Sequence, residues 1–196
     1  MNYIFYIMGK SASGKDSIYR KIVSELDVNT IVIYTTRPKR DHEIDGSEYH
    51  FVNENFYDKM HDDDMIIEER IYSTIYGNWT YFTAKDNIDI GSKNYIGIGT
   101  LESYLRISEY FGSNVVIPIY IEVDDGIRLM RAVMREQNES SPKYAELCRR
   151  FIADSEDFSE NKLISANIIR RFSNNNSFDE CYCEIKRYIT SMIDND

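Results

Sequence analysis

A lysine near the N-terminus follows a glycine-rich stretch whose spacing suits phosphate binding. The segment GKSASGKDS, residues 9–17, places Gly9, Gly14 and Lys15 in the order G-x-x-x-x-G-K. In such a loop, backbone N–H groups converge on phosphate oxygens, the following helix adds positive potential, and the lysine bridges the terminal phosphates. The predicted ATP phosphate-binding residues are Gly9, Ser11, Ala12, Ser13, Gly14, Lys15, Asp16 and Ser17. A plain strand-to-helix turn is the alternative, and the apolar strand before the loop and the helical pattern after it disfavour that reading.

The residue after the lysine is an acid, whereas this loop usually carries a hydroxyl group there. Asp16 takes that position, and the hydroxyl comes one place later at Ser17. A carboxylate is a good hard-oxygen ligand for Mg²⁺, although its charge lies unfavourably close to phosphates when the metal is absent. We therefore predict a Mg²⁺ site that uses Asp16 or Ser17.

A second basic group lies in an otherwise acidic chain. Arg37 and Arg40 are three residues apart, so two planar guanidinium groups can reach one phosphate, and Tyr49 adds a phenolic donor. The formal charge of −10 and the pI near 4.9 argue against a nucleic-acid or anionic-membrane surface. Any anionic ligand must therefore be held by local basic clusters such as this one. Solvated arginines in a turn are the alternative.

Strands alternate with helices along most of the chain and would position these residues. Short apolar runs at 3–8, 94–99, 115–123 and 167–172 precede amphipathic patterns at 15–26, 100–111, 124–137 and 178–193. This order predicts an α/β fold whose parallel sheet is covered on both faces. Residues 34–83 interrupt the rhythm with β-prone pieces and predict an inserted lobe. The polar segment 136–144 predicts a loop between two helices, and the asparagines at 174–176 predict a turn.

Composition limits the location and the redox chemistry of the protein. No apolar run reaches the roughly 18 residues that a membrane helix needs, and the N-terminus lacks the pattern of a signal peptide. We expect a cytoplasmic protein with no membrane partner. The three cysteines lack metal-ligand spacing, and Cys181 and Cys183 would not share a helix face. They are expected to be reduced thiols.

The stretch YTTRPKRDHEIDGSEYHFV, residues 34–52, resembles the signature of guanylate kinases. The matching residues are Thr35, Thr36, Arg37, Arg40, His42, Glu43, Gly46, Tyr49, Phe51 and Val52. The resemblance implies a three-layer P-loop NTPase core at 1–33, 84–130 and 151–196, a mainly β NMP-binding lobe at 34–83 and a short helical lid at 131–150. It also implies transfer of the γ-phosphoryl group of ATP to GMP with Mg²⁺ as the cofactor.

The resemblance assigns further residues to the two substrates. Arg37, Arg40 and Tyr49 would hold the GMP phosphate. Glu68 would accept hydrogen bonds from guanine, with Glu69 as the alternative, and Tyr76 would reach the phosphate. Lys15, Arg131, Arg135 and Arg150 would act in catalysis, with Arg149 as the alternative to Arg150. The lid arginines could instead simply pair with Glu136, Glu146 or Asp154.

Three positions depart from the family pattern and leave the acceptor open. Gly97 and Gly99 stand where the family usually carries an Asp-x-Asp, and Ile33 replaces a hydroxyl residue. We hypothesise that Asp16 replaces the missing acid near Mg²⁺. The alternatives to a GMP kinase are a kinase for another nucleoside monophosphate or small phosphorylated acceptor, and a non-catalytic guanylate-kinase-like binding module.

Overall fold

A five-stranded parallel sheet forms the centre of the protein, for which the computed structural model describes residues 1–41, 43–74 and 77–194. Its strands are β2 (Asn29–Thr30), β7 (Tyr95–Gly99), β1 (Ile4–Met8), β8 (Val116–Glu122) and β9 (Arg171–Ser173), in that spatial order. The pairings β1–β7, β1–β8, β2–β7 and β8–β9 are all parallel. The expected parallel sheet is therefore confirmed.

Helices cover both faces of this sheet. Side chains of β1 alternate, so Phe5 and Ile7 pack with helices α1 (Lys15–Glu25) and α7 (Phe178–Asp194) on one face. Ile4, Tyr6 and Met8 pack on the other face, with α3 (Leu101–Phe111) and α6 (Glu160–Ser165). The five residues of β1 are all buried because both faces are covered. This arrangement is the three-layer core that the strand and helix rhythm predicts.

The last strand is shorter and begins later than the sequence pattern predicts. We expected a strand over 167–172, whereas β9 covers Arg171–Ser173. The preceding residues end α6 instead, because the N–H of Ile168 donates to the carbonyl of Leu163 at 2.9 Å. Asn167 adopts a left-handed backbone with φ of 55° at this helix end. The apolar run NIIRRF therefore divides between a helix terminus and a strand.

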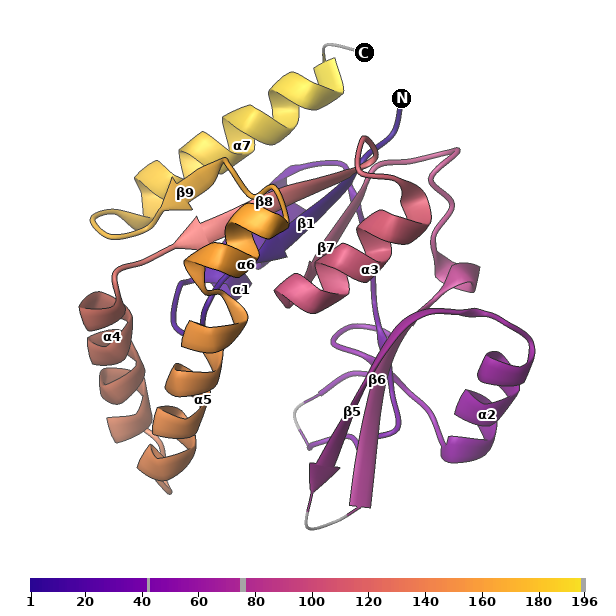
Figure 1. Cartoon of the computed structure of the whole chain (residues 1–196), viewed down its shortest axis with the longest axis horizontal. Coiled ribbons are helices and arrows are strands. Elements are labelled where there is room, and N and C mark those ends of the chain that lie inside the picture. Colours follow the sequence, from indigo (N-terminus) through magenta and orange to yellow (C-terminus); the bar gives the residue numbers. More distant parts are fainter. Residues whose placement is uncertain (42, 75–76, 195–196) are drawn as a thin grey trace.

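The inserted segment forms a second, smaller sheet. Its strands lie in the order β4 (His50–Phe51), β3 (Tyr34–Thr35), β6 (Gly77–Ala84) and β5 (Ile66–Thr74). Helix α2 (Glu54–Asp62) packs Met60 against Tyr34 and Phe82, and the short η1 helix (Lys85–Asn87) leads back to the core. The long β5–β6 hairpin extends away from the central sheet (Figure 1).

Two helices form a hairpin that projects from the same side of the core as the β5–β6 hairpin (Figure 1). They are α4 (Asp125–Gln137) and α5 (Tyr144–Asp157), and the predicted polar loop lies between them. Arg128 of α4 is buried and lies 3.6 Å from the ring centroid of Phe151. Its Nη2 group donates to the hydroxyl of Ser155 at 2.8 Å. The buried guanidinium group of Arg128 therefore links α4 to α5.

Helix α7 is amphipathic, and its cysteines behave as the spacing predicts. Cys181 is buried beside Ile185, whereas Cys183 is exposed on the opposite side of the helix. Within the described residues, every helix is too short or too polar to cross a lipid bilayer.

Candidate active site

The phosphate-binding loop predicted from the sequence lies between β1 and α1. Gly14 adopts a left-handed backbone with φ of 88° and directly precedes the helix, which begins at Lys15. The N–H groups of Ser17 and Ile18 donate to the Gly14 carbonyl at 3.1 and 3.0 Å. A side chain at residue 14 would be strained in this conformation, because L-residues rarely adopt it. The glycine thus turns the chain from the strand into the helix, whose N-terminus attracts anions.

An asparagine from the other end of the chain braces this loop. Asn174 directly follows β9, is buried, and donates from Nδ2 to the Ser13 carbonyl at 2.8 Å. The neighbouring Asn175 accepts from the N–H of Asp124 at 2.8 Å. The sequence indicated only a turn at 174–176. Asn174 instead supports the phosphate loop, and the cluster of three asparagines after an apolar run was the available signal.

A carboxylate from the helical hairpin contacts the phosphate loop. The backbone N–H of Ser11 donates to Oδ2 of Asp154 at 2.7 Å, and that same oxygen lies 3.7 Å from Nη1 of Arg128. Lys10 also pairs with Asp125 at 3.3 Å. Both contacts join the loop or its surroundings to the hairpin. Because Asp154 is an anion bound to a loop N–H, it occupies a donor that a phosphate oxygen could use.

The two predicted magnesium ligands lie in the first turn of α1. Asp16 and Ser17 are both exposed, and Oδ2 of Asp16 lies 3.6 Å from Nζ of Lys15. A carboxylate and a hydroxyl at the start of one helix supply the hard oxygen atoms that Mg²⁺ prefers. The donor set therefore fits the predicted ion, and its remaining ligands would come from phosphate oxygens and water.

Arg37 is held in place by a buried ion pair. Its Nη2 and Nη1 groups donate to the two carboxylate oxygens of Glu43 at 2.6 and 3.0 Å, and only 4% of its surface is exposed. The two N–H donors of Arg37 lower the pKa of Glu43 to about 2. Arg40 is exposed, and its backbone N–H donates to Oε2 of Glu43. The pairing fixes the orientation of the Arg37 guanidinium group.

A tyrosine that the sequence analysis did not select completes this cluster. The hydroxyl of Tyr81 accepts from Nε of Arg37 at 3.1 Å, and its ring lies 5.6 Å from that of Tyr49. Arg37 also lies 5.4 Å from the ring centroid of Tyr49. The residue chosen from the sequence, Tyr76, lies outside the described residues, as does His42. The position of Tyr81 beside Arg37 depends on the register of β6 against β3, which the sequence pattern does not give.

The two adjacent glutamates point to opposite sides of β5. Glu68 is buried and accepts from the hydroxyl of Thr83 at 2.7 Å. Glu69 is exposed and accepts from the hydroxyl of Tyr57 at 2.6 Å. Because successive strand residues face opposite sides, only one of them shares a face with Tyr81, which is paired with Arg70 across the hairpin. That residue is Glu68.

The phosphate loop, Tyr49 and Tyr81 line a cleft of about 580 Å³ between the core, the inserted lobe and the helical hairpin. Arg37, Arg40 and Glu68 are not among its described lining residues. Its volume suits a small-molecule site. The lining residues are Gly9, Ser11, Lys15, Asp16, Ile33, Tyr49, Arg70, Tyr72, Trp79, Tyr81, Ile98, Gly99, Thr100, Glu146, Arg149, Asp154 and Phe158. The phosphate loop and the lobe tyrosines, which are far apart in the sequence, thus meet at one cavity.

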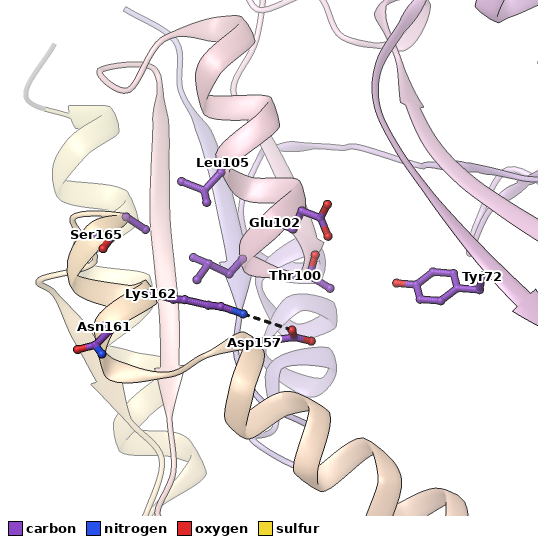
Figure 2. A pocket seen from close by; sticks show the side chains of 10 residues that line it. Tyr72, Thr100, Glu102, Leu105, Asp157, Asn161, Lys162 and Ser165 are labelled. Atoms are coloured by element: carbon purple, nitrogen blue, oxygen red, sulfur yellow. Dashed lines mark ion pairs between the residues drawn. The ribbon is translucent and has the colours of Figure 1, made fainter.

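A second cavity, of about 640 Å³, adjoins the cleft between α3 and α6. Thr100 and Tyr72 line both cavities. Figure 2 shows the side chains of Leu105 and Glu102 on one wall, and the Lys162–Asp157 ion pair, whose atoms are 3.8 Å apart, on the other. The cleft therefore continues past the start of α3.

The arginines of the helical hairpin lie in two different places. Arg149 lines the cleft, and its Nε and Nη2 groups donate to the two oxygens of Glu146 at 2.7 Å each. Arg135 and Arg150 line a separate cavity of about 440 Å³ near the tip of the hairpin. Arg131 is half-buried on α4. In this conformation the arginines are therefore divided between the cleft and the hairpin tip.

The glycines of β7 make room for Tyr6. A Cβ atom on Gly99 would lie 2.3 Å from the Tyr6 hydroxyl oxygen and 2.6 Å from Oγ of Ser103. The Tyr6 hydroxyl donates to that Ser103 oxygen at 2.8 Å, inside the core. Burial raises the pKa of Tyr6, which therefore stays protonated. The missing Asp-x-Asp thus accompanies an aromatic side chain that fills the adjoining space.

Comparisons with known proteins agree with this geometry. The family model described as guanylate kinase matches residues 2–192. The chain is 30% identical over 139 residues to a guanylate kinase from Thermotoga maritima, covering 68% of this chain and 66% of the relative. It is 38% identical over 76 residues to a guanylate kinase from Zymomonas mobilis, covering 38% of this chain and 35% of that relative. The aligned part thus spans less than two thirds of the length of either curated relative.

The fold also matches a solved structure. The crystal structure of guanylate kinase from Anaplasma phagocytophilum aligns with a TM-score of 0.66 at 16% identity, covering 97% of this chain and 86% of that one. At 16% identity this likeness shows the fold, and the family-model match over residues 2–192 establishes that the chain belongs to the guanylate kinase family.

Proposed function

We propose that this protein is an ATP-dependent nucleoside monophosphate kinase that transfers the γ-phosphoryl group of ATP to GMP. One observation carries the proposal: the phosphate loop lines the same cleft as Tyr49 and Tyr81, which contact Arg37. A donor phosphate and an acceptor phosphate would then lie in one cavity. Transfer of this kind depends mainly on positioning and charge neutralisation.

The donor is proposed to bind at the N-terminus of α1. Loop N–H groups would hold the β- and γ-phosphates, and the Lys15 ammonium group would bridge them. Asp16 and Ser17 would hold Mg²⁺, which supplies charge neutralisation between the phosphates when it is bound. Asp154 would leave the Ser11 N–H as the donor phosphates enter, because both are anions that compete for one donor.

The acceptor phosphate is proposed to bind beside Arg37. Glu43 fixes the guanidinium group of Arg37, and the exposed Arg40 supplies a second one from the same turn. The hydroxyl groups of Tyr49 and Tyr81 would donate to the phosphate oxygens. Burial raises the pKa of Tyr49, which keeps its hydroxyl proton available for donation.

The helical hairpin is proposed to act as a lid. Arg131, Arg135 and Arg150 remain the predicted catalytic arginines, and Arg149 joins them because it already lines the cleft. Closure would exchange the Glu146 carboxylate for phosphate oxygens on Arg149. The in-line transfer needs no covalent enzyme intermediate, because these cations stabilise the charge on the moving phosphoryl group.

A coupled ADP-release assay across GMP, dGMP, AMP, UMP and CMP tests the proposal. We expect turnover that requires Mg²⁺ and is fastest with GMP. Faster turnover with another nucleotide would show that the protein is a kinase with a different acceptor. No turnover with any of the five would favour a non-catalytic binding module. The cytoplasmic location stays a prediction, and fractionation of the native host would test it.

A further inference from the structure

One face of the β5–β6 hairpin carries a row of polar and aromatic side chains. The cross-strand pairs are Glu68 with Thr83, Arg70 with Tyr81, and Tyr72 with Trp79. Because side chains alternate along a strand, these six share one face of the hairpin. Four of them, namely Arg70, Tyr72, Trp79 and Tyr81, line the cleft. Tyr81 adjoins the Arg37 cluster, and Glu68 and Thr83 lie toward the core end of the hairpin.

Arg70 stands beside Glu68 at the boundary between the buried interior and the cleft. Its Nε group donates to Oε2 of Glu68 at 3.1 Å, and Nη2 donates to Oε1 at 3.4 Å. The Glu68 side chain is only 1% exposed, compared with 12% for Arg70. The arginine is therefore the member of the pair that a ligand in the cleft meets first.

The carboxylate of Glu68 is already occupied on both oxygens. Oε1 accepts from the Thr83 hydroxyl at 2.7 Å in addition to Nη2 of Arg70, and Oε2 accepts from Nε. Arg70 retains donors, since its Nη1 group donates to no other residue in the part of the chain that the structure describes. The charged pair thus offers N–H donors to the cleft and little acceptor capacity.

The described carboxylates that line the cleft are Asp16, Glu146 and Asp154, and they belong to α1 and the helical hairpin. Glu102 of α3 lies instead with Glu68 at a separate cavity of about 490 Å³. Gly97 and Gly99 contribute no side chains, and the Tyr6 hydroxyl that fills the adjoining space is committed to Ser103. A base in the cleft would therefore be recognised mainly by the guanidinium group of Arg70. This is a different arrangement from one in which free carboxylates read amino groups of the base.

We propose that Arg70 is a specificity-determining residue that binds the 6-oxo edge of an acceptor purine. An arginine can donate to O6 and N7 of a 6-oxopurine, whereas the 6-amino group of adenine presents donors that the guanidinium repels. The site then accepts GMP and IMP and rejects AMP. The 2-amino group of guanine has a small role, because its natural acceptor, Glu68, is held by Arg70 and Thr83. The inference rests on the proposed kinase function.

Steady-state kinetics with GMP, IMP and AMP test the inference in the wild-type protein and in Arg70→Met. In the wild type we expect kcat/KM for GMP and IMP to be similar and well above that for AMP. Arg70→Met should lower kcat/KM about 5- to 150-fold for both 6-oxopurines and leave AMP nearly unchanged. Arg187→Met, an exposed arginine on α7, is the matched control and should change none of the three values.

The ratio of kcat/KM for GMP to kcat/KM for AMP shows whether Arg70 recognises the base or only forms a structural ion pair with Glu68. If Arg70→Met lowers activity with all three nucleotides equally, Arg70 is structural and the inference is wrong. It is also wrong if wild-type protein rejects IMP as strongly as AMP. Because Arg70→Met leaves Glu68 buried without its partner, Arg70→Lys provides a second variant that keeps the positive charge. It should lose part of the GMP preference, because lysine lacks the planar fork.

Calorimetric titration with the same nucleotides distinguishes failure of the inference from failure of the proposed function. Binding of GMP and IMP without turnover, weakened by Arg70→Met, would refute the kinase activity and support the role of Arg70. If the protein turns over GMP and the Arg70→Met variant keeps the preference for GMP over AMP, the kinase activity is supported and the role of Arg70 is refuted.

Discussion

Replacing Gly99 by alanine tests whether Tyr6 fills the space beside the end of β7. A Cβ atom at residue 99 would lie 2.3 Å from the Tyr6 hydroxyl oxygen, 3.1 Å from Cζ of Tyr6 and 2.6 Å from Oγ of Ser103. Unstrained carbon contacts need about 3.5 Å. The Tyr6 ring is 1% exposed and packs beside Tyr104, so it has little room to retreat.

The expected destabilisation follows from these contacts. Forcing an extra carbon into a packed core costs about 1–3 kcal/mol. Alanine also restricts the unfolded chain more than glycine does, and this effect offsets about 0.4–1 kcal/mol of the packing cost. We therefore expect Gly99→Ala to lower the free energy of unfolding by about 1–2 kcal/mol. Tyr6→Phe removes the closest atom, so the same substitution should cost about 1 kcal/mol less in that background.

Urea denaturation followed by circular dichroism measures the four free energies of unfolding in this double-mutant cycle. Gly126→Ala on α4 is the control, because beyond its chain neighbours and the backbone of its own helix no atom lies within 4 Å of the position of the new Cβ. Helix propensity also favours alanine there. It should be neutral or stabilising. An unchanged stability of Gly99→Ala, or an equal loss with and without Tyr6→Phe, would refute the claim that Tyr6 and residue 99 compete for space.

Three further perturbations address the phosphate loop and the acceptor cluster. Asp154→Asn should tighten Mg²⁺-ATP binding about fivefold in a calorimetric titration, because a neutral acceptor holds the Ser11 N–H about 1 kcal/mol less strongly than a carboxylate does; equal or weaker binding would contradict competition. Asp16→Ser should lower the Mg²⁺-dependent rate in the ADP-release assay, since the carboxylate is the predicted metal ligand; an equal or faster rate would remove Asp16 from that role. The pKa of Glu43 is depressed to about 2, so its pairing with Arg37 stabilises the fold above the ordinary pKa of glutamate and is lost as the pH falls toward 2. The urea midpoint of the wild type should therefore fall as the pH drops from the ordinary pKa of glutamate toward 2, and Glu43→Gln should make that fall smaller. An equal fall in both proteins would argue against the stabilising role of the Arg37–Glu43 pair.

Local pattern predicted the elements that carry their own signal. The phosphate loop was predictable because glycine spacing, an apolar strand and a helical period act within about 25 residues. The alternation of strands and helices likewise predicted the covered parallel sheet. The strand over 167–172 was displaced, because the end of α6 competed for the same apolar residues. A short apolar run does not reveal which neighbour it will join.

The local sequence pattern could not predict the contacts in the site that join residues far apart in the chain. Asn174 reaches Ser13 across 161 positions, and Asp154 reaches Ser11 across 143. The spacing of residues along the chain does not predict these two contacts, because they depend on how β9 and the helical hairpin pack against the phosphate loop. Tyr81 was missed for a related reason, because its role depends on the register of β6 against β3.

The sequence by itself determined that this chain has a glycine-rich phosphate loop at the start of a helix and a core of alternating strands and helices. Those features depend on backbone preferences and hydrophobic period, which are local properties. Only the tertiary structure decided that Glu68 rather than Glu69 faces inward, that Arg70 stands between Glu68 and the cleft, and that Tyr6 fills the space beside Gly99. Strand register and close packing made these choices, because each places a side chain according to the neighbours that surround it in space.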